Sequence, residues 1–201
     1  MKYFVIFVLL TLSIACLQEN KKMANEKQIS QDVLYGEQLI ENGFLKYAET
    51  MKLDSLKLSL INSFDIYNEE NNKIAPIDAE ELAEFSFDFF LPRLNKMLKK
   101  RAFQLDVKTT NDYERTNDIF INGEKVNLYT KEELEEGNFW ELASRRFFKV
   151  INKQLHNEKI EESFYLLYGG NDLNVLLLTE NQQKIIAVKY KNDSKEIPYL
   201  P

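Results

Sequence analysis

The chain has very few of the residues that most often carry metal-dependent or nucleophilic chemistry. Its 201 residues include one histidine, His156, and one cysteine, Cys16. A structural zinc site needs about four cysteine or histidine ligands, so the sequence predicts no metal site and gives His156 a surface or helix-capping role. The patterns HExxH and GxSxG and the Walker phosphate loop are absent. We therefore expect no cofactor and no catalytic residue of these classes.

Basic residues are also fewer than acidic residues. Lysine and arginine number 26 against 32 aspartate and glutamate residues, which gives a formal net charge of −6. Phosphate backbones and anionic lipid headgroups attract basic proteins. This balance therefore argues against nucleic acid and against an anionic lipid surface as partners, and a basic or neutral protein is the more natural complement.

No apolar run at the N-terminus is long enough to span a bilayer, which requires roughly 20 residues. The uncharged run Tyr3–Ala15 is shorter, and Lys2 is the one basic residue before it. This combination is typical of a cleaved secretory signal. The run ends in Leu12-Ser13-Ile14-Ala15-Cys16, where a small residue stands directly before the sole cysteine.

The segment from Leu12 to Cys16 resembles the lipobox of bacterial lipoproteins, in which the cysteine sulfur takes a diacylglyceryl group and becomes the mature N-terminus. That family usually has leucine three residues before the cysteine, where this chain has Ser13. The resemblance implies that palmitate-type chains on Cys16 anchor the protein in the bacterial cell envelope, since two or more acyl chains anchor stably. Leu17 resembles the default for outer-membrane delivery. The alternatives are an ordinary cleaved signal with an incidental cysteine, and a buried apolar helix.

The rest of the chain predicts a tether and one domain. Residues 16–29 are polar and charged beyond Leu17 and lack aromatic side chains, which is typical of a flexible linker. We expect residues 1–15 to be the signal peptide, 16–29 the lipidated tether, and 30–201 a single α+β domain. Several amphipathic helices should pack on a small, mainly antiparallel sheet.

The first half of the domain has mostly helical spacing of apolar residues. This spacing runs through residues 33–51, whereas residues 54–67 also alternate and fit either helix or strand. The segment Asp78–Glu81 has the spacing of a capping box at a helix start. An apolar stripe from Leu82 to Leu98 follows, and Pro92 should kink or break it.

The second half changes to the period of two that β-strands show. Alternating residues on both sides of Asn122-Gly123 predict a β-hairpin, because both turn positions tolerate positive φ. The segment Thr130–Glu133 has a second capping-box spacing, and a long amphipathic helix should follow Gly137. Trp140 to Leu155 provide its apolar face.

A second strand pair is expected over residues 164–168 and 173–179, joined by Gly169-Gly170-Asn171. The all-apolar run 175–178 predicts a central strand that is buried on both faces. Residues 180–190 fit either a helix capped by Thr179 or a further strand. Pro198 and Pro201 are expected to end the order.

Acidic residues are densest around the start of the long helix. Their preference for helix N-termini accounts for part of this density, and a docking surface for a basic partner is the functional interpretation. The five residues are Glu132, Glu133, Glu135, Glu136 and Glu141. A second interpretation, from a different class, is an envelope enzyme that uses two carboxylates on glycan or peptidoglycan. Such an enzyme requires two acids in one pocket, at least one of them with a raised pKa.

Two segments of the C-terminal half, Asn138–Phe148 and Leu167–Leu173, loosely resemble immunity proteins of bacterial toxin systems. These are small acidic α+β proteins that bind and mask a cognate toxin. The resemblance implies a non-enzymatic, steric mechanism, in which an acidic face covers the active cleft of the toxin. Charge complementarity would raise the association rate.

Overall fold

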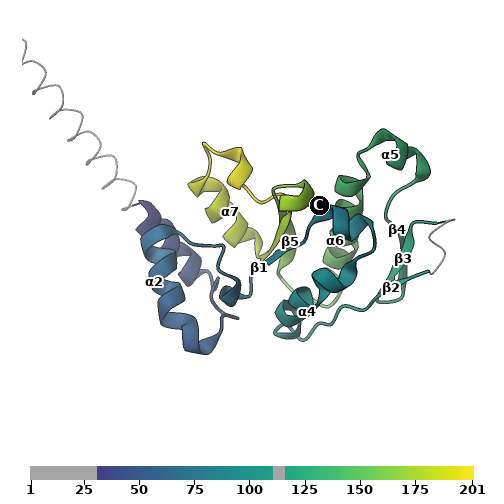
Figure 1. The fold of residues 1–201 in the computed structure, drawn as a ribbon. Helices are drawn as coiled ribbons and strands as arrows, with labels where there is room; N and C mark the ends of the chain where they lie inside the picture. The colour runs from purple at the N-terminus through teal and green to yellow at the C-terminus, as the bar shows by residue number, and fades with distance from the viewer. Residues whose placement is uncertain (1–30, 111–115) are drawn as a thin grey trace, which may run out of the picture.

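The computed structural model describes residues 31–110 and 116–201, which form an α+β protein. Two groups of helices lie on either side of a three-stranded antiparallel sheet, and a second sheet of three strands lies at one end of the molecule (Figure 1). The α+β prediction is confirmed, but the two sheets differ from the single sheet that we expected. The predicted signal, the tether and Cys16 lie outside the described residues.

The first group of helices contains residues 31–41, α2 (Leu53–Ser63) and α7 (Glu180–Lys189). A single 3₁₀ turn, η1 (Thr50–Lys52), leads into α2. At the end of α2, Phe64 adopts a left-handed conformation with a φ of 51°. This turn directs the Phe64 ring into the core, where the residue is 1% exposed. The ambiguity over residues 54–67 is therefore resolved as helix up to Ser63 and irregular chain beyond.

The central sheet has the strand order β1 (Ile74–Pro76), β6 (Asn174–Leu178), β5 (Ser163–Leu167). Side chains of β6 alternate between two separate apolar clusters: Val175 and Leu177 belong to one, and Leu176 and Leu178 to the other. A strand that is covered on both faces has no solvent-facing positions, which is why its sequence is continuously apolar. The prediction of a buried central strand is confirmed.

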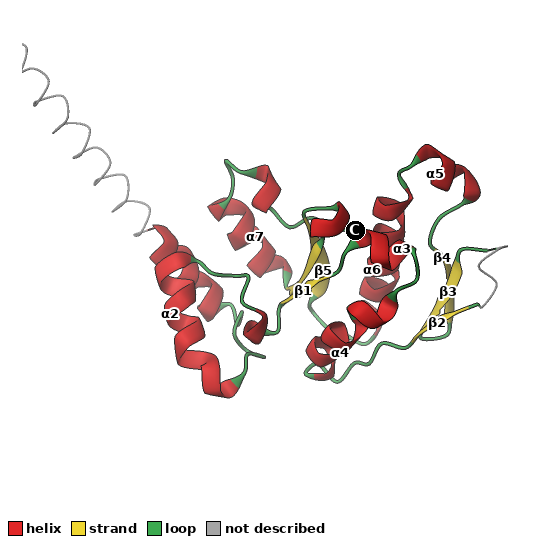
Figure 2. Ribbon diagram, in the orientation of Figure 1, coloured by secondary structure: helices red, strands yellow, loops and turns green. Residues whose placement is uncertain are grey.

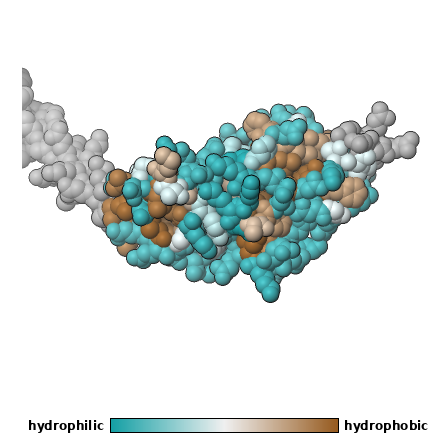
Figure 3. All heavy atoms as spheres, turned by 90° about the horizontal axis from the view of Figure 1, so that it is seen from below, coloured by the Kyte–Doolittle hydropathy of each residue, from teal (hydrophilic) through white to brown (hydrophobic). Residues whose placement is uncertain are grey.

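Each apolar cluster joins one face of this sheet to one group of helices, and Figure 2 shows the layers side by side. On one face lie α3 (Ala79–Ala83), α4 (Leu91–Lys99) and α6 (Phe139–Asn157). The other face is covered by residues 31–41, α2 and α7. Much of the surface is hydrophilic, and apolar atoms show at a few places between polar ones on the face seen in Figure 3.

The second sheet has the order β2 (Val107–Thr109), β3 (Asp118–Ile121), β4 (Glu124–Asn127). Asn122 and Gly123 join β3 to β4 with φ values of 50° and 83°, so the predicted hairpin is confirmed. α5 (Lys131–Glu136) follows, and Gly137 separates it from α6 as expected. Ile119, Ile121 and Val126 of this sheet belong to the same apolar cluster as α6.

The break predicted at Pro92 occurs earlier in the chain. The Asp78 carboxylate caps α3 by accepting hydrogen bonds from the backbone amides of Glu80 and Glu81. α3 then ends at Ala83, Phe85 turns the chain with a φ of 64°, and a 3₁₀ turn, η3 (Phe87–Phe89), leads into α4. Pro92 stands in the first turn of α4, where proline costs no hydrogen bond. It therefore starts a helix and does not kink one.

At the C-terminus, where Pro198 and Pro201 were expected to end the order, Pro198 does not end it. Residues 180–189 form a helix, and the side chains of Thr179 and Gln182 complete its capping box. After the 3₁₀ turn η5 (Ser194–Glu196), Tyr199 pairs with Leu166 of β5 as an isolated antiparallel bridge. The two backbone hydrogen bonds of this bridge measure 2.7 and 2.9 Å. Proline lacks a donor, but the residue after it is free to join the edge of the sheet.

Candidate functional site

The five glutamates predicted as a docking surface do not act as one group. The Glu133 side chain closes the capping box of α5 with Thr130. Its carboxylate also accepts two hydrogen bonds from the Arg146 guanidinium, at 2.8 and 2.7 Å. The hydrogen bonds from Arg146 and from the Thr130 backbone lower the pKa of Glu133. Glu133 is therefore a residue that holds α5 against α6.

Glu141 is exposed, but it is neutralised by its neighbour on the same helix. Its carboxylate accepts a hydrogen bond from Nε of Arg145 at 2.9 Å. The other three glutamates, Glu132, Glu135 and Glu136, are exposed on α5 and form no ion pair with any residue that the structure describes. Leu134, on the same helix, has 44% of its surface exposed and lies on the flank of α5 away from Glu132 and Glu136. We call these four residues the α5 face.

The α5 face stands on a short helix that is fixed at both ends. Thr130 caps its N-terminus, and Gly137 closes its C-terminus with a φ of 77°. Arg146 ties its first turn to α6. In Figure 1, α5 lies far from the first described residues, which are near α2 at the other end of the molecule. The α5 face is therefore both preorganised and remote from the point where the N-terminal segment enters the domain.

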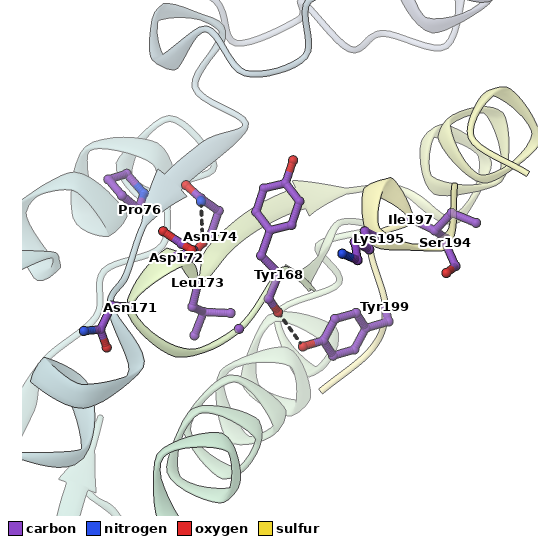
Figure 4. A pocket seen from close by; sticks show the side chains of 11 residues that line it. Pro76, Tyr168, Asn171, Asp172, Leu173, Asn174, Ser194, Lys195, Ile197 and Tyr199 are labelled. Carbon is purple, nitrogen blue, oxygen red and sulfur yellow. Dashed lines mark hydrogen bonds between the residues drawn. The ribbon is translucent and has the colours of Figure 1, made fainter. Parts of the chain in front are cut away.

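A hollow of about 620 Å³ lies between the end of β5, the turn η4 (Gly170–Asp172) and the segment after η5. Tyr168 and Tyr199 contribute aromatic rings to its wall, and the Tyr199 hydroxyl donates to the Tyr168 carbonyl oxygen at 2.8 Å (Figure 4). Asp172 and Lys195 are its charged lining residues. One carboxylate in this wall is not the pair that a glycosidase needs.

The wall of this hollow is braced by a tyrosine and glutamate cluster behind it. The hydroxyl groups of Tyr67 and Tyr168 both donate to the carboxylate of Glu196. Burial, followed by the hydrogen bond to Glu196, raises the pKa of Tyr67. The cluster fastens the segment after α7 to the end of β5, which explains the ordered C-terminus.

A buried ionic cluster of Lys73, Arg101 and Glu162 is a feature that the sequence did not indicate. Nζ of Lys73 donates to the Glu162 carboxylate and to Oε1 of Gln182, the latter at 2.9 Å. Arg101 donates to the same carboxylate through Nε at 2.5 Å and Nη2 at 2.8 Å. The side chains of Lys73 and Arg101 are each 1% exposed, and that of Glu162 is 7% exposed. Two buried cations therefore share one carboxylate.

Burial and the neighbouring charges together lower the pKa values of both Lys73 and Glu162. Desolvation lowers the pKa of Lys73 from 10.5 to about 8, although the negative charge of Glu162 partly opposes the change. Burial raises the pKa of Glu162, but the hydrogen bond from Arg101 and the charges of Lys73 and Arg101 outweigh it, so that the net pKa is lowered. The carboxylate is consequently ionised at neutral pH and holds both cations.

Among the described carboxyl groups, every pKa that is shifted is lowered. These groups are Glu49, Asp118, Glu124, Glu132, Glu133, Glu162 and Glu180. A general acid in a glycosidase needs the opposite shift. The paired-carboxylate interpretation therefore gains no support from residues 31–110 and 116–201.

His156, the only histidine in the sequence, is exposed in the last turn of α6. In the part of the chain that the structure describes, no group of three or more His, Cys, Asp and Glu side chains is placed to hold a metal ion. Nor does any helix of these residues combine the length and the apolar character that crossing a membrane requires. Comparison with protein-family models, with curated proteins and with solved structures finds no match to this chain.

Proposed function

We propose that this chain is a lipid-anchored protein of the bacterial cell envelope, held by Cys16, that works by binding a basic protein partner through the α5 face. It would act without chemistry of its own, by masking a surface of the partner, as immunity proteins mask toxins. The observation that carries the proposal is an exposed leucine, Leu134, on the same short helix as three glutamates without ion pairs, a helix that is fixed at both ends.

The composition of the α5 face suits association with a basic protein. An apolar side chain that becomes buried in an interface supplies contact energy, and charged residues on the same element mainly raise the association rate and select the partner. Because Thr130, Gly137 and Arg146 already hold the helix in place, binding would cost little conformational entropy. The overall charge of −6 favours the same class of partner.

The position of the α5 face also agrees with an anchor at Cys16. The first described residues lie near α2, and α5 lies toward the opposite end of the molecule (Figure 1). A tether that joins the domain at residue 30 would thus leave the α5 face pointing away from its attachment point. An envelope protein that meets a partner arriving from outside the membrane needs this orientation.

Reversing the charge of the α5 face should abolish most of the binding. The test uses the full-length chain to capture proteins from the envelope and secreted fractions of the bacterium that makes it, and then measures the affinity of the captured partner. We expect the triple variant E132K/E135K/E136K to bind at least about ten-fold more weakly, and the wild-type affinity to fall as salt rises.

The matched control is E37K/E41K/D54K, which makes the same change in net charge at exposed positions of residues 31–41 and α2. This variant should bind as the wild type does, apart from a small long-range effect on association. Equal losses in both triple variants, or an affinity that does not respond to salt, would contradict a docking role for the α5 face.

A further inference from the structure

A second hollow, of about 420 Å³, opens directly beside the buried ionic cluster. Its back wall contains Arg101, Glu162 and Gln182, and its rim contains Lys46 and Lys159. Thr179, the N-cap of α7, also lines it, so the positive end of that helix dipole lies at the hollow. The volume is within the range of small-molecule sites in proteins.

The charges around this hollow do not balance. Lys46, Arg101 and Lys159 line it and Lys73 lies immediately behind it, whereas Glu161 and Glu162 are its carboxylates. Four cations therefore face two anions in a chain whose net charge is −6. Lys46, Lys159 and Glu161 are exposed, whereas Lys73 and Arg101 share Glu162 in the interior, so one positive charge is uncompensated among the buried groups. Burying this charge is costly unless an anion compensates for it.

The buried cations also retain hydrogen-bonding capacity. A guanidinium carries five N–H groups, and Arg101 uses three of them, toward Glu162 and toward the Met97 carbonyl oxygen. The described residues provide no acceptor for the other two. The Arg101 guanidinium is stacked on the Tyr47 ring, 4.0 Å from its centroid. It is therefore held in a fixed orientation, as a site for an oxyanion requires.

From this arrangement we propose that the hollow binds the phosphate group of a small solute, with Arg101 at the back and Lys46 and Lys159 at the rim. A phosphate dianion matches the excess of two positive charges around the hollow, one of which is buried, and its oxygens accept hydrogen bonds from the N–H groups that the cluster leaves unused. The remaining space has room for the organic part of a phosphorylated molecule. This site is separate from the α5 face and does not depend on its role.

Titration calorimetry of the full-length chain with inorganic phosphate, at constant ionic strength with chloride as the balancing anion, tests the proposal. We expect saturable binding of one phosphate per chain. Lys46 and Lys159 are exposed, so the variant K46Q/K159Q should fold normally, and it should bind phosphate at least about ten-fold more weakly. Glu161→Gln removes a carboxylate from the rim and should strengthen binding by about three-fold.

The control variant is K191Q/K195Q, which removes the same charge from exposed lysines outside this hollow. It should bind phosphate nearly as tightly as the wild type. The proposal is overturned if the wild type shows no saturable binding, if both double variants weaken binding equally, or if Glu161→Gln weakens it. Any of these results would mean that the buried ionic cluster of Lys73, Arg101 and Glu162 has only a structural role.

Discussion

Replacing Glu162 with glutamine should lower the free energy of unfolding by about 3–5 kcal/mol, because it removes the one carboxylate that Lys73 and Arg101 share. Glutamine has nearly the same shape, so that packing is conserved and only the charge is lost. Both cations would then remain buried without a counter-ion. Urea denaturation at neutral pH, compared with the wild type, measures the loss.

The adjacent exposed residue provides the control for this measurement. Glu161→Gln removes the same charge one position earlier in the chain and should change the free energy of unfolding by less than about 0.5 kcal/mol.

The contribution of Glu162 to the free energy of unfolding should also depend on pH. Its pKa is lowered in the folded protein, so its stabilisation is present above the pKa of the unfolded chain and is lost as pH falls through the folded value. Wild type and E162Q should therefore converge in acid, and a constant difference would contradict the cluster.

The second large effect is expected at Gly36, where the helix over residues 31–41 crosses α2. A Cβ atom at this position would lie 2.3 Å from the carbonyl oxygen of Leu60 and 2.9 Å from Cα of Ile61. These neighbours are backbone atoms and have no rotamer to change. Gly36→Ala should therefore separate the two helices and lower the free energy of unfolding by about 1–3 kcal/mol. Thermal and urea unfolding both report this change.

The loss of stability expected for Gly36→Ala is opposite in sign to the effect of intrinsic helix propensity. Alanine stabilises an unconstrained helix interior by about 1 kcal/mol relative to glycine, so a stabilising Gly36→Ala would show that the helices do not touch as described. The control is Gly169→Ala, since no atom lies within 4 Å of the added Cβ there. This control should leave the free energy of unfolding within about 0.5 kcal/mol of the wild type.

Elements with a local cause could be predicted from the sequence. The Thr130 cap and the Asn122-Gly123 turn depend on side chains and backbone within four residues, and both are confirmed. The Thr179 cap is equally local, but the sequence left a helix and a strand open there, and the structure shows the helix. The buried strand β6 was visible because covering both faces of a strand leaves no polar positions. In each case the residues that decide the structure are adjacent in the sequence.

Features that depend on distant partners could not be predicted in this way. Lys73 and Glu162 are 89 residues apart, and Arg101 is 61 residues from Glu162, so no spacing in the sequence links them. In the sequence, Lys73 follows a polar turn and Glu162 lies in a charged linker, so both side chains would be expected to be solvated. Tyr199 likewise pairs with a residue that is not its sequence neighbour, Leu166 of β5. The separate sheet of β2, β3 and β4 was not predicted. Alternating apolar residues indicate a strand but do not show which other strands it pairs with.

The candidate surface was predicted in part. The density of glutamate around residues 132–141 was visible, but the sequence could not show which of these residues are neutralised. Glu133 is held by Arg146 and Glu141 by Arg145, and one of these pairs spans two helices. The three-dimensional arrangement therefore reduces five predicted residues to three, and it adds Leu134 as an exposed apolar residue on the same helix.

A lipid on Cys16 is what would hold this molecule in the envelope and leave the α5 face free to meet a partner. Mass spectrometry of the native N-terminal peptide measures it directly. We expect a chain that begins at residue 16, lacks residues 1–15 and carries the mass of a diacylglyceryl thioether, and a Cys16→Ser variant that leaves the membrane fraction. A native chain that retains residues 1–15 or has no acyl mass at Cys16, with an unchanged distribution of the serine variant, would contradict the anchor and the function built on it.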